Sequence, residues 1–207
     1  MSNFVLIYAD EHLIVVNKPS GMLSVPGRGP DKQDCLIHRV QAEFPDARSV
    51  HRLDMSTSGL LLIARGPEMQ RELSRLFEQR KVSKRYIAVV AGQLEAAVGE
   101  INLPLICDWP NRPRQKVDFA IGKPSQTRYR LLAFDPRSAC SRVELEPITG
   151  RSHQLRVHLA ECGHPILGDE LYGVETSAPR LLLHATQLGF TLPGSDQFRH
   201  FESPPEF

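Results

Sequence analysis

Apolar residues occur in short runs along this chain, and their spacing predicts more strands than helices. Residues 4–8 and 13–17 read as two strands on either side of a turn at Asp10-Glu11. Residues 60–64 form a continuous apolar run of strand length, which predicts a strand buried on both faces. Further strands are expected at residues 86–91, 126–134, 142–148, 181–184 and 188–191.

Helical spacing is seen in three places. A short helix is expected within residues 32–44, before Pro45. Pro67 suits the first turn of a second helix, in which Met69, Leu73, Leu76 and Phe77 fall on one face. A third helix over residues 152–162 would end at Gly163.

The order of these elements decides the fold class. Strands and helices do not alternate regularly, so we expect an α+β protein with a mixed, largely antiparallel sheet flanked by helices, and not a doubly wound parallel sheet. Nothing in the composition marks a linker or a repeat, so residues 1–207 are predicted to form a single domain.

Composition narrows the class of protein further. Hydrophobic residues make up 41% of the chain, which is enough for a buried core. No apolar run approaches the roughly 20 residues that cross a bilayer, and no secretory signal opens the sequence. The four cysteines are widely spaced, which argues against a zinc site or a disulfide framework and favours a reducing compartment, the cytoplasm.

The charge balance does not by itself indicate a nucleic-acid partner. Lys and Arg total 25 against 24 for Asp and Glu. Basic residues are nevertheless concentrated in two clusters, which are either solvated faces or RNA-backbone contacts. The first contains Arg71, Arg75, Arg80, Lys81, Lys84 and Arg85, and the second Arg112, Arg114 and Lys116.

The most informative segment is the polar stretch at residues 51–59, directly before the buried strand. Functional side chains are often placed on such loops at the edge of a rigid sheet. Taken alone, however, Asp54 has a structural alternative, because an Asp in a turn commonly binds nearby backbone N–H groups.

Other segments of the chain favour a functional role for Asp54 over the structural alternative. The segment His51-Arg52-Leu53-Asp54-Met55-Ser56-Thr57-Ser58-Gly59 resembles the central motif of the RluA family of pseudouridine synthases, H-R-L-D followed by T-S-G and an apolar strand. Residues 103–113 resemble its minimal, dual-specificity subgroup, so the N-terminal S4-type RNA-binding domain of other members is not expected. Further blocks that resemble the family follow in the expected order: Asn17–Gly21, Lys84–Tyr86, Gly150–His158, Gly163–Asp169 and Leu183–Ala185.

This resemblance implies a bent pseudouridine synthase sheet and a set of site residues. Asp54 would be the essential carboxylate, Arg151 the guanidinium that keeps it charged, and Tyr86 the aromatic residue that stacks on uracil. Arg52 is the expected wedge that replaces the flipped base. Substrate contacts are further expected from His51, Lys84 and Arg112. One departure is Ser152, which stands where the family has Thr and also has a hydroxyl able to cap a helix.

The implied reaction isomerises uridine, so it needs neither metal nor organic cofactor. A metal site is also disfavoured by the spacing of His153, His158 and His164, which lacks the H-E-x-x-H pattern. The expected substrates are structured RNAs, namely 23S rRNA and the tRNA anticodon stem-loop, and we expect a monomer with no obligatory protein partner and no membrane contact. Two alternatives are an RNA-binding module without catalysis and a hydrolase that uses Asp54 as a nucleophile.

Overall fold

The computed structural model describes residues 4–173 and 178–207 and divides the chain into two compact units. The first unit comprises the described residues up to Lys84 together with His184–Glu206. The second comprises Arg85–Leu183 and Phe207. The chain enters the second unit inside strand β5 (Ser83–Ala91) and returns inside strand β11 (Leu183–Thr191).

The first unit is built on a mixed sheet with the strand order β1-β2-β4-β11. All of its strand pairs are antiparallel except β4 with β11, which is parallel. Strand β12 pairs with β11, and β3 pairs with β4. The strand bounds are β1 Val5–Ala9, β2 Leu13–Lys18, β3 Ala47–Ser49, β4 Ser58–Arg65 and β12 Phe198–Glu202.

Two helices and a short 3-10 turn complete this unit. They are the 3-10 turn Pro30–Lys32, α1 (Leu36–Glu43) and α2 (Gly66–Glu78). The predicted apolar face of α2 is confirmed, because Leu73 is buried while Met69, Leu76 and Phe77 pack against the same core cluster. Strand β4 is buried over all but its last residue, as a continuous apolar run predicts.

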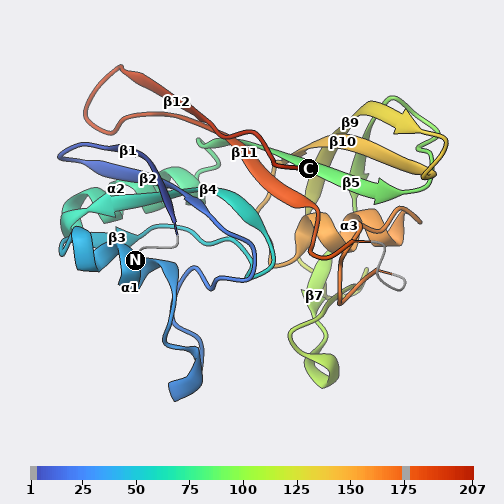
Figure 1. Cartoon of the computed structure of the whole chain (residues 1–207), viewed down its shortest axis with the longest axis horizontal. Helices are drawn as coiled ribbons and strands as arrows, with labels where there is room; N and C mark the ends of the chain where they lie inside the picture. Colours follow the sequence, from blue (N-terminus) through green and yellow to red (C-terminus); the bar gives the residue numbers. More distant parts are fainter. Residues whose placement is uncertain (1–3, 174–177) are drawn as a thin grey trace. The chain divides into compact units, whose positions relative to one another are not determined.

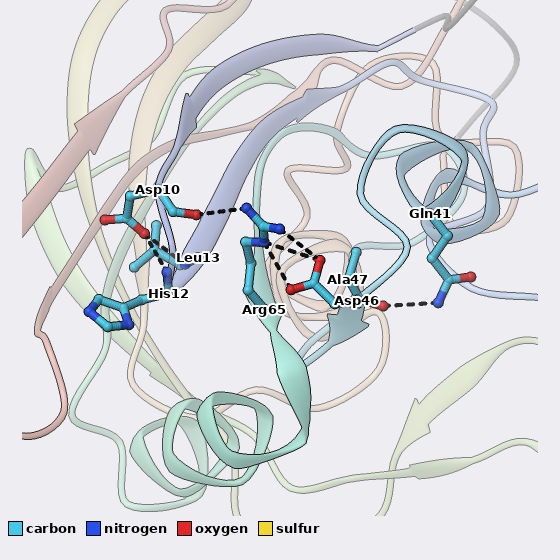
Figure 2. A network of polar contacts seen from close by, with 7 residues as sticks. All are labelled: Asp10, His12, Leu13, Gln41, Asp46, Ala47 and Arg65. Carbon is cyan, nitrogen blue, oxygen red and sulfur yellow. Dashed lines mark hydrogen bonds and ion pairs between the residues drawn. The ribbon is translucent and has the colours of Figure 1, made fainter.

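Arg65 fixes the end of β4 by binding two neighbouring segments (Figure 2). Its guanidinium donates to both carboxylate oxygens of Asp46, at 3.0 to 3.1 Å, and to the main-chain oxygen of Asp10 at 3.2 Å. The side chain of Asp10 in turn accepts the N–H groups of His12 and Leu13. The β1–β2 turn, the segment before β3 and the end of β4 are therefore tied to one another.

The second unit is an antiparallel sheet with the strand order β5-β10-β9-β6, together with a separate pair, β7-β8. Helix α3 (Gln154–Glu161) is buried from Gln154 to Leu159, and Leu155 and Leu159 belong to the core of this unit. Figure 1 shows α3 beside strands β5, β9 and β10 of the same unit. The remaining bounds are β6 Val98–Asn102, β7 Leu105–Cys107, a 3-10 turn Trp109–Asn111, β8 Gln115–Val117, β9 Gln126–Asp135 and β10 Cys140–Pro147.

The α+β class and the mixed, largely antiparallel strand pairing are confirmed. One prediction is wrong: residues 183–191 form a single strand, β11, where two were expected. The third helix is shorter than predicted, and its N-cap is His153, with no side-chain hydrogen bond to the cap. Ser152 therefore does not cap this helix.

Candidate active site

Asp54 lies in a tight turn between the chain leading from β3 and the buried strand β4. The N–H of Thr57 donates to the main-chain oxygen of Asp54 at 3.1 Å, which closes the turn. Leu53 and Thr57 on either side are buried, whereas Asp54 is only partly buried. The turn therefore places a carboxylate near the surface while its neighbours anchor the backbone.

The segment at residues 18–24, which begins at the last residue of β2, holds this turn from one side. Ser24 Oγ donates to the oxygen of Leu53 at 2.7 Å and accepts the N–H of Leu53 at 3.1 Å. Ser20 Oγ donates to the oxygen of Ser56 at 2.7 Å, and the N–H of Gly21 donates to the oxygen of Met55 at 2.8 Å. These bonds fix the backbone immediately before and after Asp54.

Lys18 is the third element of this support and is fully buried. Its ammonium donates to the main-chain oxygens of Pro19, Met22 and Met55 at 2.9, 2.8 and 3.0 Å. Burial lowers the pKa of Lys18 to about 7, and the negative charge of Asp54 opposes that shift. The sequence resemblance included Asn17–Gly21, but no function was assigned to Lys18; a lysine at the end of an apolar strand was the available signal.

The start of β4 is fixed by its parallel neighbour β11. Gly59 has φ +115°, and a Cβ there would lie 2.3 Å from the oxygen of Ala185. Ser58 Oγ hydrogen-bonds His184 Nδ1 at 2.9 Å, and His184 Nε2 hydrogen-bonds the oxygen of Ser203 at 3.1 Å. Because Nε2 faces a carbonyl, it carries the proton, so Nδ1 accepts the hydroxyl of Ser58.

His51 is used inside the first unit. Its Nε2 accepts the N–H of Leu62 at 2.9 Å, and its ring stacks on Phe77 with centroids 4.3 Å apart. Burial and the nearby positive charge of Lys84 lower the pKa of His51 to about 3, so the ring is neutral. The ring nitrogen that faces β4 is therefore occupied by the backbone.

Arg52 and Lys84, also in the first unit, differ in exposure. The side chain of Arg52 is exposed and makes no hydrogen bond or ion pair with residues 4–173 or 178–207. Lys84 is half-buried, and its pKa is lowered by burial and by the charge of Arg80. Arg52 is thus available to a ligand in a way that Lys84 is not.

The second unit contains Tyr86, Arg151 and Arg112. Tyr86 pairs with Leu145 in the sheet and packs against the core of this unit, while remaining partly exposed. Arg151 is exposed, with its guanidinium 3.5 Å from the oxygen of Pro124. Arg112 is exposed and lies over the ring of Trp109, with 4.7 Å between the guanidinium carbon and the ring centroid.

Gln154 shapes the turn that carries Arg151. Its Oε1 accepts the N–H of Arg151 at 3.1 Å and the hydroxyl of Thr149 at 2.7 Å. Its Nε2 donates to the oxygen of Gln126 and to Thr127 Oγ1. The buried side chain of Gln154 thus orders the turn that carries Arg151.

The described residues include no candidate metal cluster and no candidate membrane-spanning helix. Among those residues, no three His, Cys, Asp or Glu side chains are grouped so that they could hold a metal ion. None of the helices they form is long and apolar enough to span a membrane.

Comparison with known proteins identifies relatives across nearly the whole chain. Residues 12–161 match the RNA pseudouridylate synthase family. The chain is 50% identical over 206 residues to the dual-specificity RNA pseudouridine synthase RluA of Escherichia coli K12, covering 98% of this chain and 94% of that relative. RluA of Yersinia pestis is 52% identical, with coverage of 98% and 100%. The solved structure of human RNA pseudouridylate synthase domain containing 1 matches with a TM-score of 0.82 and 29% identity, covering 100% of this chain and 85% of that one.

Proposed function

Because this chain belongs to the RluA family of RNA pseudouridine synthases, we propose that it modifies both 23S rRNA and the first anticodon-loop position of certain tRNAs, with Asp54 as its catalytic carboxylate. The role of Asp54 is supported by the hydrogen bonds that hold its turn from one side. Leu53, Met55 and Ser56 are all held by the segment at residues 18–24. Such preorganisation is what a catalytic group requires.

The reaction is an internal rearrangement. The bond between uracil N1 and ribose C1′ breaks, a bond between C5 and C1′ forms, and the proton on C5 is replaced by one on N1. A carboxylate can act on C1′, on the base or on a sugar proton, and each route requires Asp54 to be ionised and fixed in place. Because no atom or electron is gained or lost, the proposed mechanism uses no cofactor.

Three further side chains are proposed to act on the target nucleotide. Arg151 would keep the catalytic carboxylate ionised through its positive charge. Tyr86 would stack on uracil through its ring and assist loss of the C5 proton through its hydroxyl. Arg52 would occupy the space left by the flipped base, which costs a few kcal/mol to unstack. The exposed guanidinium of Arg52 supports that role.

The remaining residues are proposed to act less directly. Lys84 and Arg112 would bind RNA phosphates, so that affinity should fall with increasing salt. His51 would position the backbone of β4 beside the Asp54 turn, since its Nε2 already accepts the N–H of Leu62. We place the protein in the cytoplasm, acting as a monomer, because four widely spaced cysteines suit a reducing compartment.

The test uses RNA tritiated at uracil C5. The protein should release tritium to water from a tRNA anticodon stem-loop and from a 23S rRNA fragment, without producing free uracil. Free uracil would instead indicate a hydrolase, and no release from any RNA would indicate a binding module. Release from only one of the two RNAs would overturn the proposed dual specificity.

A matched pair of variants tests the role of Asp54. Asp54→Asn should abolish tritium release while stability changes by less than about 1 kcal/mol and RNA still binds. Asp196→Asn, the same chemical change at an exposed position of the same unit, should leave activity unchanged. If Asp54→Asn unfolds the protein, its role is to cap the turn; if it remains active, the proposed role is wrong.

A further inference from the structure

Residues Leu103–Lys123 form an arm of the second unit, built on the strand pair β7-β8. In Figure 1 the arm, marked by β7, extends away from strands β5, β9 and β10. Leu105 pairs with Val117 on one side. On its other side, the N–H of Leu105 donates to the oxygen of Lys123 at 3.0 Å, and the N–H of Lys123 donates back at 2.8 Å. The arm is therefore an ordered, hydrogen-bonded element.

The arm exposes large apolar side chains that contribute nothing to the core. Trp109 is 65% exposed, Phe119 79% and Ile121 71%. Trp109 begins a short 3-10 turn, and Asp118 Oδ1 holds the turn that follows β8 by accepting the N–H groups of Ala120 and Ile121. Both turns are ordered, so these apolar side chains project from a fixed backbone.

The charges on the arm are unbalanced and favour an anionic partner. The arm has four basic and two acidic residues, whereas the whole chain has 25 and 24. Both acidic side chains accept hydrogen bonds from the arm itself: Asp108 from Asn111, and Asp118 from two backbone N–H groups. None of the basic side chains forms an ion pair with the described residues, although the charge of Lys116 helps to lower the pKa of Asp118. These basic residues are Arg112, Arg114, Lys116 and Lys123.

Two side chains outside the arm fix its base. The hydroxyl of Tyr172 accepts the N–H of Gln115 at 2.7 Å and hydrogen-bonds His153 Nδ1 at 2.7 Å. His158 Nε2 hydrogen-bonds the oxygen of Leu103 at 3.0 Å. The arm is thus connected to the start and to the buried face of helix α3. An element that is already ordered loses less conformational freedom on binding a ligand than a flexible one does.

We propose that Trp109 stacks on an unpaired nucleobase of the RNA substrate outside the target uridine, while Arg112 covers the ring of Trp109 and, together with the neighbouring cations, binds phosphates. An exposed indole beside a guanidinium, on an arm without free acidic groups, has the chemistry that holds single-stranded bases. The inference rests on the proposed action on RNA loops, but it concerns a contact outside the catalytic residues. With this contact, the arm would distinguish RNA with unpaired bases from duplex RNA.

The sequence provides a specific probe, because Trp109 is the only tryptophan in the chain. The Asp54→Asn protein would be titrated with an anticodon stem-loop and with a blunt duplex of the same stem. A base stacked on the indole should quench its fluorescence and protect it from acrylamide. The stem-loop should produce both effects and the duplex neither. Binding of the stem-loop with unchanged fluorescence and acrylamide access would overturn the proposal.

Substitutions measure the contribution of the ring. Trp109→Ala should raise the Kd for the stem-loop about tenfold, and Trp109→Phe should restore most of the loss because a smaller ring still stacks. Phe198→Ala is the matched control, since Phe198 is 63% exposed on β12 and should leave binding unchanged. Thermal unfolding would verify that each variant is folded. Equal affinity of Trp109→Ala and the parent would refute the proposal and leave a protein partner as the explanation of the exposed rings.

The two proposals fail in distinguishable ways. If stem-loop quenching and protection occur but the wild-type protein releases no tritium from the same stem-loop, the stacking contact stands and the proposed tRNA substrate falls. If tritium release is normal and Trp109→Ala binds like the parent, the proposed function stands and the stacking contact falls.

Discussion

The Nζ atom of Lys18 lies 3.0 Å from the main-chain oxygen of Met55, the residue that follows Asp54. The same oxygen accepts the N–H of Gly21, so two donors from one segment meet at the turn that carries Asp54. Burying an ammonium group costs free energy of folding. Here the fully buried ammonium orders the turn and adds positive charge near the carboxylate of Asp54.

Replacing Lys18 should impair catalysis through the position of Asp54. Lys18→Met keeps the length of the side chain but removes all three hydrogen bonds to backbone oxygens. A turn displaced by even 1 Å can cost on the order of 100-fold, so we expect kcat/KM to fall about that much. Tritium release measures the loss. A variant as active as wild type would show that Gly21, Ser20 and Ser24 suffice to hold the turn.

Lys18 should also make stability depend on pH. Its pKa falls from 10.5 in the unfolded chain to about 7 in the folded one, so between these values the unfolded chain binds one more proton. Stability therefore rises with pH in this window, by up to about 1.4 kcal/mol per pH unit. Urea unfolding of wild type and Lys18→Met at pH 7.5 and 9.5 should show the wild type gaining about 2 kcal/mol relative to the variant. A constant difference would contradict the lowered pKa.

His51 should stabilise the first unit at neutral pH and lose that effect in acid. In His51→Phe, the N–H of Leu62 lacks its acceptor, and we expect a loss of about 2 kcal/mol at pH 7. The pKa of His51 falls from 6.5 to about 3 on folding, so below pH 6.5 the unfolded chain binds the extra proton and wild-type stability declines. By pH 5 the wild type should have lost about 2 kcal/mol, closing its lead over the variant in urea unfolding.

Gly59 should tolerate no side chain. An added Cβ would lie 2.3 Å from the oxygen of Ala185, where β4 and β11 pair in parallel. Gly59→Ala should therefore cost more than about 4 kcal/mol. Gly66→Ala is the control, because Gly66 also has positive φ, +73°, but open space around it, so backbone strain alone should cost about 1 kcal/mol. Similar losses for the two variants would mean that the close approach is not decisive.

Arg52 should matter for opening the RNA more than for binding it. If its guanidinium holds the space of the flipped base, Arg52→Ala should slow single-turnover tritium release from a stem-loop about 100-fold. Arg137→Ala, which removes another exposed arginine from the β9–β10 turn, is the control and should have no effect. The wedge role would be wrong if Arg52→Ala weakened binding but left the saturating rate unchanged.

Regular elements with strong local patterns were predicted from the sequence. Strand β4, strand β10 and helix α2 each have a period or an apolar run long enough to specify their structure locally. The sequence predicts two strands in place of β11 because Thr186 and Gln187 interrupt the apolar run, while pairing with β4 and β12 keeps the backbone extended. The short strands β3, β6, β7, β8 and β12 were missed, because a few residues become a strand only beside their partner.

By itself, the sequence determined the family, the identity of the proposed catalytic aspartate and the position of its turn before a buried strand, because these depend on ordered motifs and local pattern. Only the tertiary structure decided how that turn is held. It buried Lys18 under three carbonyl oxygens, directed His51 to the backbone of β4 and set Trp109 on an ordered arm. These roles depend on contacts between residues distant along the chain, and a one-dimensional pattern carries no information about which distant groups share a hydrogen bond.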